Sequence, residues 1–308
     1  MITVGGFNTS VDKSMRTDQV RIGGVSRVRD VRAWPGGKGV HVALTAAVLG
    51  ERVRLVGLID AAHRALFEDF LGARGVEFHG VPTAERVRTC LAVRDGEGRV
   101  TELLEPGPWV DADTRREILA QFRAAAAEAD VSLLCGSLPP GMDPADYAGL
   151  ASELGASGRR CGVDTSGEPL ARAVAARPFL VKPNREEAAA LMEEPVAGVG
   201  DAARASRALQ ARGVALSVVS LGAQGAVACW QGRVVHAQVP VRAVNPVGSG
   251  DCLLGGMAVG LSRGASAEEA LRLGVACGAA NAASPETGLV RREDVESLLP
   301  RVISVEVQ

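Results

Sequence analysis

The order of the apolar segments constrains the fold of this chain more than any other feature. Short runs rich in β-branched residues alternate with longer segments rich in alanine and leucine along most of the 308 residues. Such alternation is typical of a mostly parallel β-sheet whose strands are connected by helices. We therefore predict an α/β fold in which helices flank a central, mostly parallel sheet on both faces.

Hydrophobic periodicity and turn residues place the individual elements. Strands of the main sheet are predicted at residues 2–6, 53–59, 131–135, 160–164, 179–182 and 216–220. Helices between them are predicted at residues 39–49, 62–72, 114–129, 144–154, 186–192 and 202–212. The last third of the chain is predicted to hold antiparallel strands and then helices, at residues 226–230, 234–239, 252–261, 267–283 and 292–299.

Two segments, residues 11–34 and 86–104, interrupt this alternation. Both are charged and strand-like, and both are poor in helical pattern. We expect them to pair into a small β-sheet that is inserted into, rather than appended to, a single domain of residues 1–308. This sheet would form a lid outside the main sheet.

Charge and cysteine content exclude several classes of protein. The 34 basic and 36 acidic residues are mixed along the chain, so no basic face is expected to neutralise a nucleic-acid backbone. The six cysteines are widely separated and form no C-x-x-C motif, which argues against a zinc site or a disulfide framework. No apolar run reaches the ~18 residues of a membrane span, and the N-terminal segment resembles a strand rather than a signal peptide. We therefore expect a cytoplasmic protein that binds neither nucleic acid nor membrane.

A glycine-rich turn precedes an apolar helical run, in the stretch Asn245-Pro246-Val247-Gly248-Ser249-Gly250-Asp251. Gly248 and Gly250 permit close approach of the backbone to a ligand, and the unpaired N–H groups at the start of a helix attract anions. Asp251 is placed to accept the proton of a hydroxyl that attacks a bound phosphate. An acidic residue in a first helical turn also has a purely structural explanation, because the helix dipole favours it.

A second glycine cluster, Pro35-Gly36-Gly37-Lys38-Gly39, opens the first long helix and offers another anion site. Neither cluster has the spacing of a Walker A loop or of a dinucleotide-binding fingerprint. Taken alone, the second cluster is also explained as an ordinary structural turn.

Two further motifs lie between the glycine clusters. Asn184 and Glu187, in Lys182-Pro183-Asn184-Arg185-Glu186-Glu187, are three residues apart and can face one point, where their oxygens suit Mg²⁺ held through water. The alternative is a capping box, in which Asn184 caps the following helix and Glu187 bonds back to it. Ser220-Leu221-Gly222-Ala223-Gln224-Gly225 ends another strand in a turn that either passes a nucleotide or closes a plain hairpin.

These motifs, in this order, resemble the ribokinase-like (PfkB) family of sugar kinases over essentially the whole chain. Gly36-Gly37-Lys38-Gly39 with Val42-Ala43 is similar to the first signature of that family, and Val247-Gly248-Ser249-Gly250-Asp251 to the second. Lys182-Pro183-Asn184-x-x-Glu187 and Ser220-Leu221-Gly222-x-x-Gly225 are similar to motifs between the two signatures. The resemblance implies a ribokinase-like α/β domain with a β-sheet lid, and a phosphotransferase that uses ATP and Mg²⁺.

The resemblance also implies roles for individual residues. Asp251 would deprotonate the acceptor hydroxyl, while Gly248, Ser249 and Gly250 form the anion hole for the transferred phosphoryl group. The residues implied in substrate binding are Asp12, Gly37, Lys38, His41, Cys90 and Ser137, with Arg27 and Arg88 reaching the phosphate of the sugar. Those implied in nucleotide binding are Lys182, Asn184, Ser220, Gly222, Gly225, Gly248, Gly250 and Asn281. Asn184 and Glu187 would hold Mg²⁺ through water.

Within the family, the chain is most similar to the branch that contains 1-phosphofructokinase and tagatose-6-phosphate kinase. The stretches that carry this similarity are Asn8-x-x-x-Asp12, Ser26-Arg27-Val28, Gly136-Ser137-Leu138-Pro139-Pro140-Gly141, Asp164-Thr165-Ser166-Gly167 and the turn ending at Asp251. We therefore expect a kinase of a ketohexose phosphate, of the fructose 1-phosphate or tagatose 6-phosphate type. Forked arginine N–H groups suit the substrate phosphate, although Arg27 and Arg88 are equally compatible with the exposed face of a lid strand.

Two residues depart from the pattern of this branch. His41 stands where the first signature usually has Asn, and Cys90 stands where Asn is frequent. An imidazole and a thiol form different hydrogen bonds from an amide, so these departures bear on which hydroxyl is recognised. The alternatives are a kinase of an unphosphorylated sugar or nucleoside, and a catalytically silent protein that senses a sugar or nucleotide.

A homodimer formed through the open edges of the lid is expected, and a requirement for a monovalent cation stays open.

Overall fold

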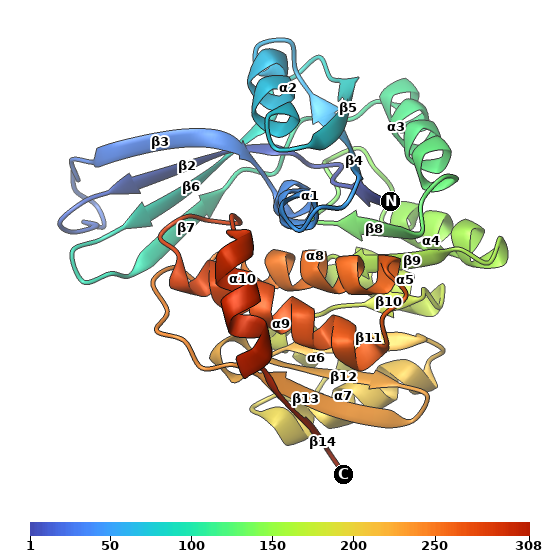
Figure 1. Cartoon of the computed structure of the whole chain (residues 1–308). Helices are drawn as coiled ribbons and strands as arrows, with labels where there is room; N and C mark the ends of the chain where they lie inside the picture. The colour runs from blue at the N-terminus through green and yellow to red at the C-terminus, as the bar shows by residue number, and fades with distance from the viewer.

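A computed structural model describes residues 1–308, which form a large and a small β-sheet (Figure 1). The large sheet has ten strands in the order β14-β13-β12-β11-β10-β9-β8-β1-β4-β5. Its parallel strands are β1 (Ile2–Gly5), β4 (Val53–Ile59), β5 (Val76–Pro82), β8 (Val131–Cys135), β9 (Arg160–Asp164), β10 (Leu180–Val181) and β11 (Leu216–Ser220). The antiparallel strands are β12 (Ala226–Trp230), β13 (Arg233–Gln238) and β14 (Ile303–Glu306). The predicted mostly parallel sheet is confirmed.

Helices cover both faces of this sheet, as predicted. One face carries α1 (Lys38–Val48), α2 (Arg64–Gly72), α8 (Ser249–Ser262), α9 (Ala267–Ala283) and α10 (Arg292–Leu298). The other face carries α3 (Ala112–Ala126), α4 (Asp146–Ala156), α5 (Gly167–Ala175), α6 (Arg185–Met192) and α7 (Val199–Ala211). Consecutive strand residues serve opposite faces: Leu133 packs in the core with α1 and α8, whereas Leu134 packs with α3 and α4. Burial on both faces explains why these strands are continuous apolar runs.

The small sheet projects from one side of the body and is the predicted lid (Figure 1). Its strands, in spatial order, are β3 (Arg29–Gly36), β2 (Ser10–Arg16), β6 (Arg88–Arg94) and β7 (Val100–Leu104). A loop, rather than continuous strand, joins β2 to β3, and Arg27 lies exposed in it. The placement of Arg27 on a lid strand is therefore wrong. The strand is interrupted at Gly23, which has a φ of 73°, a conformation that suits a turn and not an extended strand.

Close helix packing fixes the position of α8. A Cβ atom on Gly255 would lie 2.8 Å from the Cβ of Thr45 in α1, and one on Gly256 would lie 2.6 Å from the Sγ of Cys277 in α9. Only glycine permits such short separations between three helices. As a result, the N-terminus of α8 is held next to the N-terminus of α1, above the carboxyl ends of the parallel strands (Figure 1).

Three elements escaped prediction. Strand β5 lies at the edge of the sheet and alternates buried residues with exposed or half-buried ones such as Glu77 and His79. Helix α5 has only nine residues and begins at Gly167, so its periodicity is short. Strand β14 pairs with β13 through four residues near the end of the chain. Short or edge elements carry little apolar periodicity, which is the signal that sequence reasoning depends on.

The structure can also be compared with the predictions about membrane spans and about the cysteines. None of its helices combines the length and the apolar composition that a bilayer crossing requires. All six cysteines are free, and all except the half-buried Cys90 are buried. The prediction that they are unpaired packing residues agrees with these positions.

Candidate active site

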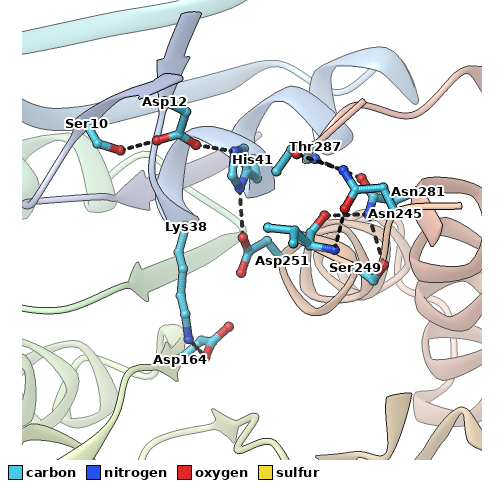
Figure 2. Close-up of polar contacts among 12 residues, drawn as sticks. Ser10, Asp12, Lys38, His41, Asp164, Asn245, Ser249, Asp251, Asn281 and Thr287 are labelled. Atoms are coloured by element: carbon cyan, nitrogen blue, oxygen red, sulfur yellow. Dashed lines mark hydrogen bonds and ion pairs between the residues drawn. The ribbon is translucent and has the colours of Figure 1, made fainter. Parts of the chain in front are cut away.

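The candidate site lies where the N-termini of α1 and α8 meet the carboxyl ends of the parallel strands (Figure 2). Helix α1 brings Lys38 and His41, helix α8 brings Asp251, and strand β9 ends at Asp164. The lid reaches the same place through Asp12 on β2. In open α/β sheets, ligands bind at this edge because the loops after the strands converge there.

The turn before α8 has the geometry expected of an anion-binding turn. Gly248 caps the helix with a φ of 82°, and a Cβ there would lie 2.7 Å from the backbone nitrogen of Gly288. The backbone N–H groups of Gly248 and Gly250 find no acceptor within the protein. Unpaired N–H groups at the positive end of a helix dipole bind phosphate readily. Asp251 follows in the first turn of the same helix, with its carboxylate buried.

Asn281 on α9 braces this turn from behind. Its Nδ2 donates to the carbonyl oxygen of Val247 at 2.8 Å and to Oγ of Ser249 at 2.9 Å, and its Oδ1 accepts from the N–H of Gly288 at 2.8 Å (Figure 2). The side chain is fully buried and its amide is occupied by the protein. The structure thus places Asn281, expected at the nucleotide, as a support of the turn.

His41 lies between two carboxylates. Its Nδ1 is 2.9 Å from Oδ2 of Asp251, and its Nε2 is 3.3 Å from Oδ2 of Asp12, an ion pair whose alignment falls short of a hydrogen bond (Figure 2). Burial alone would lower the pKa of this imidazole, but the two carboxylates outweigh burial and raise the pKa of His41 to about 10. Burial would raise the pKa of Asp12. The contact of Asp12 with His41 outweighs burial and lowers the pKa of Asp12 below its usual value.

A buried chain of charges lies beneath the two helix ends. Asp164 has no solvent exposure and is flanked by Lys38, whose Nζ is 3.1 Å from Oδ1, and by Lys182, whose Nζ is 2.9 Å from Oδ2. Burial favours the neutral carboxyl, yet the two ammonium groups lower the pKa of Asp164 below its usual range. Burial would also lower the pKa of Lys38, but Asp164, Asp251 and Glu187 together raise it. A Cβ on Gly250 would lie 3.4 Å from Nζ of Lys182, so this cation sits directly beside the anion-binding turn.

The structure forms the capping box that was the alternative to a metal site at Asn184 and Glu187. Oδ1 of Asn184 accepts from the N–H of Glu187 at 2.8 Å, and Oε2 of Glu187 accepts from the N–H of Asn184 at 2.9 Å. The other carboxylate oxygen, Oε1, lies 3.7 Å from Nζ of Lys38. No cluster of three His, Cys, Asp or Glu side chains suited to a metal occurs in the structure. A magnesium ion bound through water by one carboxylate oxygen remains compatible with this geometry.

The Ser220–Gly225 turn lies beside this capping box. The N–H of Ser220 donates to the carbonyl oxygen of Pro183 at 3.1 Å, and Ser220 forms a β-bridge with Asn184. A Cβ on Gly222 would meet nothing within 4 Å, whereas one on Gly225 would lie 2.0 Å from the carbonyl oxygen of Ala237. Gly222 thus leaves open space beside the turn, while Gly225 is required for its close packing on β13.

The lid side of the site holds Asp12 over the first glycine cluster. A Cβ on Gly36 would lie 2.0 Å from Cγ of Asp12, and Oγ of Ser10 donates to Oδ1 of Asp12 at 2.6 Å. Gly37 adopts a φ of 98° as the N-cap of α1. Cys90 is the strand partner of Asp12 on β6, and burial raises the pKa of its thiol. The two departures from the family pattern, His41 and Cys90, thus both neighbour Asp12.

A cavity of about 560 Å³ adjoins the site between the lid and the loop after β8. Arg88 and Ser137 line it together, and Ser137 Oγ accepts from Nδ2 of Asn8 at 3.0 Å. Nε of Arg88 is buried without a partner, and Nη1 makes only a long contact of 3.4 Å to the carbonyl oxygen of Glu105. Arg27 has no side-chain hydrogen bond or ion pair with any residue of the site.

Most of the residues named from the sequence therefore converge on one place, with Arg27 as the exception. Sequence reasoning assigned no role to Asp164 or Gly288. Asp164 lies in a stretch that is similar to the family, and its position at the carboxyl end of a buried strand is the signal that could mark it. Gly288, whose backbone lies against the ring of His41, carried no signal of its own.

The chain is similar to known carbohydrate kinases over almost its whole length. The model of the pfkB family of carbohydrate kinases matches residues 6–293. The 1-phosphofructokinase of Bacillus subtilis is 30% identical over 305 residues, which cover 98% of each chain. A tagatose-6-phosphate kinase of Staphylococcus epidermidis is 29% identical over 313 residues, covering all of both chains. Among solved structures, phosphofructokinase-2 of Escherichia coli in complex with substrates and products superposes with a TM-score of 0.89 at 29% identity, covering 97% of this chain and 98% of that one.

Proposed function

The chain belongs to the pfkB family of carbohydrate kinases, and from this premise we propose that it transfers the γ-phosphate of ATP to a hydroxyl of a ketohexose phosphate. The acceptor is of the fructose 1-phosphate or tagatose 6-phosphate type, in line with the names of its relatives.

One observation carries the proposal: a buried carboxylate lies beside a turn whose backbone N–H groups have no acceptor within the protein. Asp251 follows directly after Gly248 and Gly250, whose N–H groups have no acceptor in the protein. Lys182 places a positive charge next to the same turn, and the charge of Lys38 interacts with Asp251. A kinase needs this combination, because a base must meet the hydroxyl while fixed charges hold the phosphoryl group.

The proposed reaction follows from these positions. Asp251 takes the proton of the acceptor hydroxyl as its oxygen attacks the γ-phosphorus in line. The bond from phosphorus to the β-phosphate oxygen breaks, and ADP leaves with that electron pair. The N–H groups of Gly248 and Gly250 and the dipole of α8 stabilise the charge on the transferred group. Closure of the lid, which carries Asp12, would exclude water that would otherwise hydrolyse ATP.

Arg88 supports a substrate that already bears a phosphate. Its Nε is buried and has no partner, in a cavity that it shares with Ser137. A buried arginine N–H without an acceptor is costly, so the position favours an anionic ligand. Arg27, in the exposed loop, is proposed to approach the same phosphate only in an assembly or a closed state.

Lys182, Asn184 and the Ser220–Gly225 turn are proposed to bind ATP. The open space beside Gly222 allows a ligand to approach the backbone. Oε1 of Glu187 is the carboxylate oxygen left by the capping box, so Glu187 is proposed to hold Mg²⁺ through water, with Asn184 positioning it. Mg²⁺, when bound, supplies positive charge to the phosphates. The monovalent-cation requirement stays a prediction.

The lid is proposed to form a homodimer. It exposes apolar side chains on an open sheet, among them Val31 at 57% on β3 and Leu104 at 61% on β7. Exposed apolar residues on an unpaired sheet favour association. Light scattering of the purified protein checks this, and a monomer at micromolar concentration would contradict it.

ADP release across a panel of acceptors tests the proposed function. We expect turnover with fructose 1-phosphate or tagatose 6-phosphate that exceeds turnover with fructose 6-phosphate, ribose and adenosine. The Asp251→Asn variant serves as the blank, and its activity should fall by about 10²–10⁴-fold through loss of the base. Equal ATP turnover by wild type and this variant with every acceptor would contradict kinase activity.

Substitution of Arg88 tests whether the acceptor is a sugar phosphate or an unphosphorylated molecule. Arg88→Ala should raise KM for the sugar phosphate by at least about tenfold, the value of a lost charge-assisted hydrogen bond. Arg94→Ala, on the same strand β6, is the matched control and should leave KM unchanged. An unchanged KM in Arg88→Ala would favour the alternative of an unphosphorylated sugar or nucleoside.

A further inference from the structure

His41 occupies a position that the proposed reaction does not explain. Its side chain is 6% exposed and contacts the carboxylate proposed as base, Asp251, through Nδ1 at 2.9 Å. Through Nε2, 3.3 Å away, it also contacts Asp12, which is expected to hold the sugar. No other side chain touches both carboxylates, so one ring joins the lid to the N-terminus of α8 (Figure 2).

Packing fixes the plane of this ring. The backbone of Gly288 lies against it so closely that a Cβ there would be 2.1 Å from Cδ2 of His41. Gly288 is in turn held by its N–H bond to Asn281, the residue that braces the anion-binding turn. The ring therefore cannot rotate out of its place without moving the loop that supports the turn.

The charged groups around His41 are predominantly acidic. Asp12 faces it from β2 and Asp251 from α8, and Glu102 on β7 contributes negative charge at longer range. Lys38, on the same helix, directs its ammonium group away to Asp164 and Glu187. Cys90, opposite Asp12 on β6, carries a thiol whose pKa is raised by burial and which therefore stays uncharged. His41 is thus the cation in contact with both Asp12 and Asp251, while Lys38 acts on Asp251 at longer range.

We propose that His41 is a positioning residue for phosphoryl transfer, which as a doubly protonated ring holds Asp251 through Nδ1 and Asp12 through Nε2 and thereby presents Oδ1 of Asp251 to the acceptor hydroxyl. The inference rests on the proposed function, because it takes Asp251 as the base.

The proton balance leaves His41 unchanged through the reaction. The hydroxyl proton moves to Oδ1 of Asp251 as the new oxygen–phosphorus bond forms, and ADP carries away the electron pair of the broken bond. Nδ1 keeps its proton and its bond to Oδ2 throughout. The positive ring lies between the two carboxylates and lowers the pKa of Asp12. A pKa near 10 means that both ring nitrogens carry protons at neutral pH.

Two substitutions separate the two halves of this role. In His41→Asn the amide nitrogen takes the place of Nδ1, so the contact with Asp251 is kept and that with Asp12 is lost. In His41→Gln the longer side chain places its amide nitrogen near Nε2, so the contact with Asp12 is kept and that with Asp251 is lost. Both variants lose the charge. His79→Asn, which removes a histidine from a surface pair with Glu77 on β5, is the matched control.

In steady-state kinetics with the preferred sugar phosphate, the two variants should affect different parameters. His41→Gln should lower kcat by about 10–100-fold with little change in KM, since the base loses its orientation. His41→Asn should chiefly raise KM for the sugar phosphate, by about tenfold, because Asp12 loses its partner. In both variants the pH below which kcat/KM declines should move upward, because Asp12 loses the cation that keeps its pKa low. His79→Asn should match the wild type throughout.

A spectroscopic titration tests the pairing without any reference to activity. The chain has four histidines, so comparing ¹⁵N-labelled wild type with His41→Asn identifies the His41 signals. We expect both ring nitrogens of His41 to remain protonated through pH 8 and to titrate near pH 10. Titration near pH 6.5 would overturn the inference.

The outcomes distinguish this inference from the proposed function. A wild type that phosphorylates no sugar phosphate would overturn the proposed function, while the titration would still decide whether His41 joins the two carboxylates. An active wild type whose two His41 variants keep its kcat, KM and pH profile would overturn the inference alone. Unfolding curves of both variants should show a folded protein, and if His41→Gln does not fold, the titration of the wild type and the kinetics of His41→Asn still decide.

Discussion

Nζ of Lys182 lies 2.9 Å from Oδ2 of Asp164, in a place where the lysine is 3% exposed and the aspartate not at all. The pair is buried under the site, and a second lysine, Lys38, shares the same carboxylate. Burial of charges is tolerated only when they are paired, so the two cations depend on Asp164.

Replacing Asp164 with Asn should therefore destabilise the protein strongly. Lys182 would be left buried without a counter-charge, while Lys38 would keep only its 3.7 Å contact with Glu187. Loss of one partner of a buried pair costs about 3–5 kcal/mol. Urea unfolding measures the change. Glu153→Gln is the matched control, since it breaks the exposed pair with Arg123 and should cost no more than about 1 kcal/mol. A loss of less than about 1 kcal/mol in Asp164→Asn would contradict the prediction.

Removing the brace behind the anion-binding turn should reduce activity more than stability alone explains. Asn281→Ala leaves the buried N–H of Gly288 unpaired and releases Val247 and Ser249. We expect a loss of about 1–3 kcal/mol in the free energy of unfolding and a fall of kcat by tenfold or more. Ser266→Ala, which removes the exposed N-cap of α9, should cost about 1 kcal/mol without changing kcat. A normal kcat in Asn281→Ala would show that the turn keeps its geometry without the side chain of Asn281.

A methyl group on Gly36 should expel the side chain of Asp12. Gly36 does not adopt a positive φ, so alanine fits its backbone conformation, yet the new Cβ would lie 2.0 Å from Cγ of Asp12. We expect KM for the sugar to rise at least about tenfold, as for a lost hydrogen bond to a charged group. Gly149→Ala in α4, where the Cβ meets nothing within 4 Å, should bind normally. The same KM in both variants would mean that Asp12 does not bind the sugar.

The stability contributed by His41 should depend on pH in a definite direction. Its pKa is raised from 6.5 to about 10 in the folded protein, so the stabilisation is complete below pH 6.5 and is lost as the pH rises through about 10. Within this window the difference in free energy of unfolding between wild type and His41→Asn should shrink by up to about 1.4 kcal/mol per pH unit. Urea unfolding at four or five pH values gives the slopes. Parallel curves for the two proteins would contradict the charged state of His41.

Sequence periodicity was sufficient for the long elements of the fold and insufficient for the short ones. Strands β4 and β8 are buried on both faces and are apolar runs interrupted only by Arg54 and Ser132, so the sequence predicts their bounds correctly. Strand β5 and helix α5 escaped because an edge strand exposes polar residues and a nine-residue helix offers barely two turns. The sequence wrongly predicts a strand around Arg27, because the charged residues of this loop resemble the exposed face of a lid strand.

In the site, sequence motifs identify functional residues but do not predict which side chains those residues contact. Motifs marked Asp251, Lys38 and Lys182 in advance, but a motif does not reveal what each side chain contacts. The position of His41 between Asp12 and Asp251 depends on how the lid meets α8, which is a property of tertiary packing. The same holds for Asn281, whose bonds are all made with the turn and with Gly288. Residues that act through contacts far along the chain leave no periodic or spacing signal in the sequence.

The fit of the His41 ring against the bare backbone of Gly288 has an evolutionary consequence. A mutation that adds a side chain at position 288 is harmful while an imidazole occupies position 41, because the Cβ and the ring would claim the same space. The order in which the two positions change is therefore restricted, and a lineage must lose the ring before it gains a side chain at 288. Descendants that keep this histidine should keep the glycine with it, so the two positions are inherited as a pair although almost 250 residues separate them.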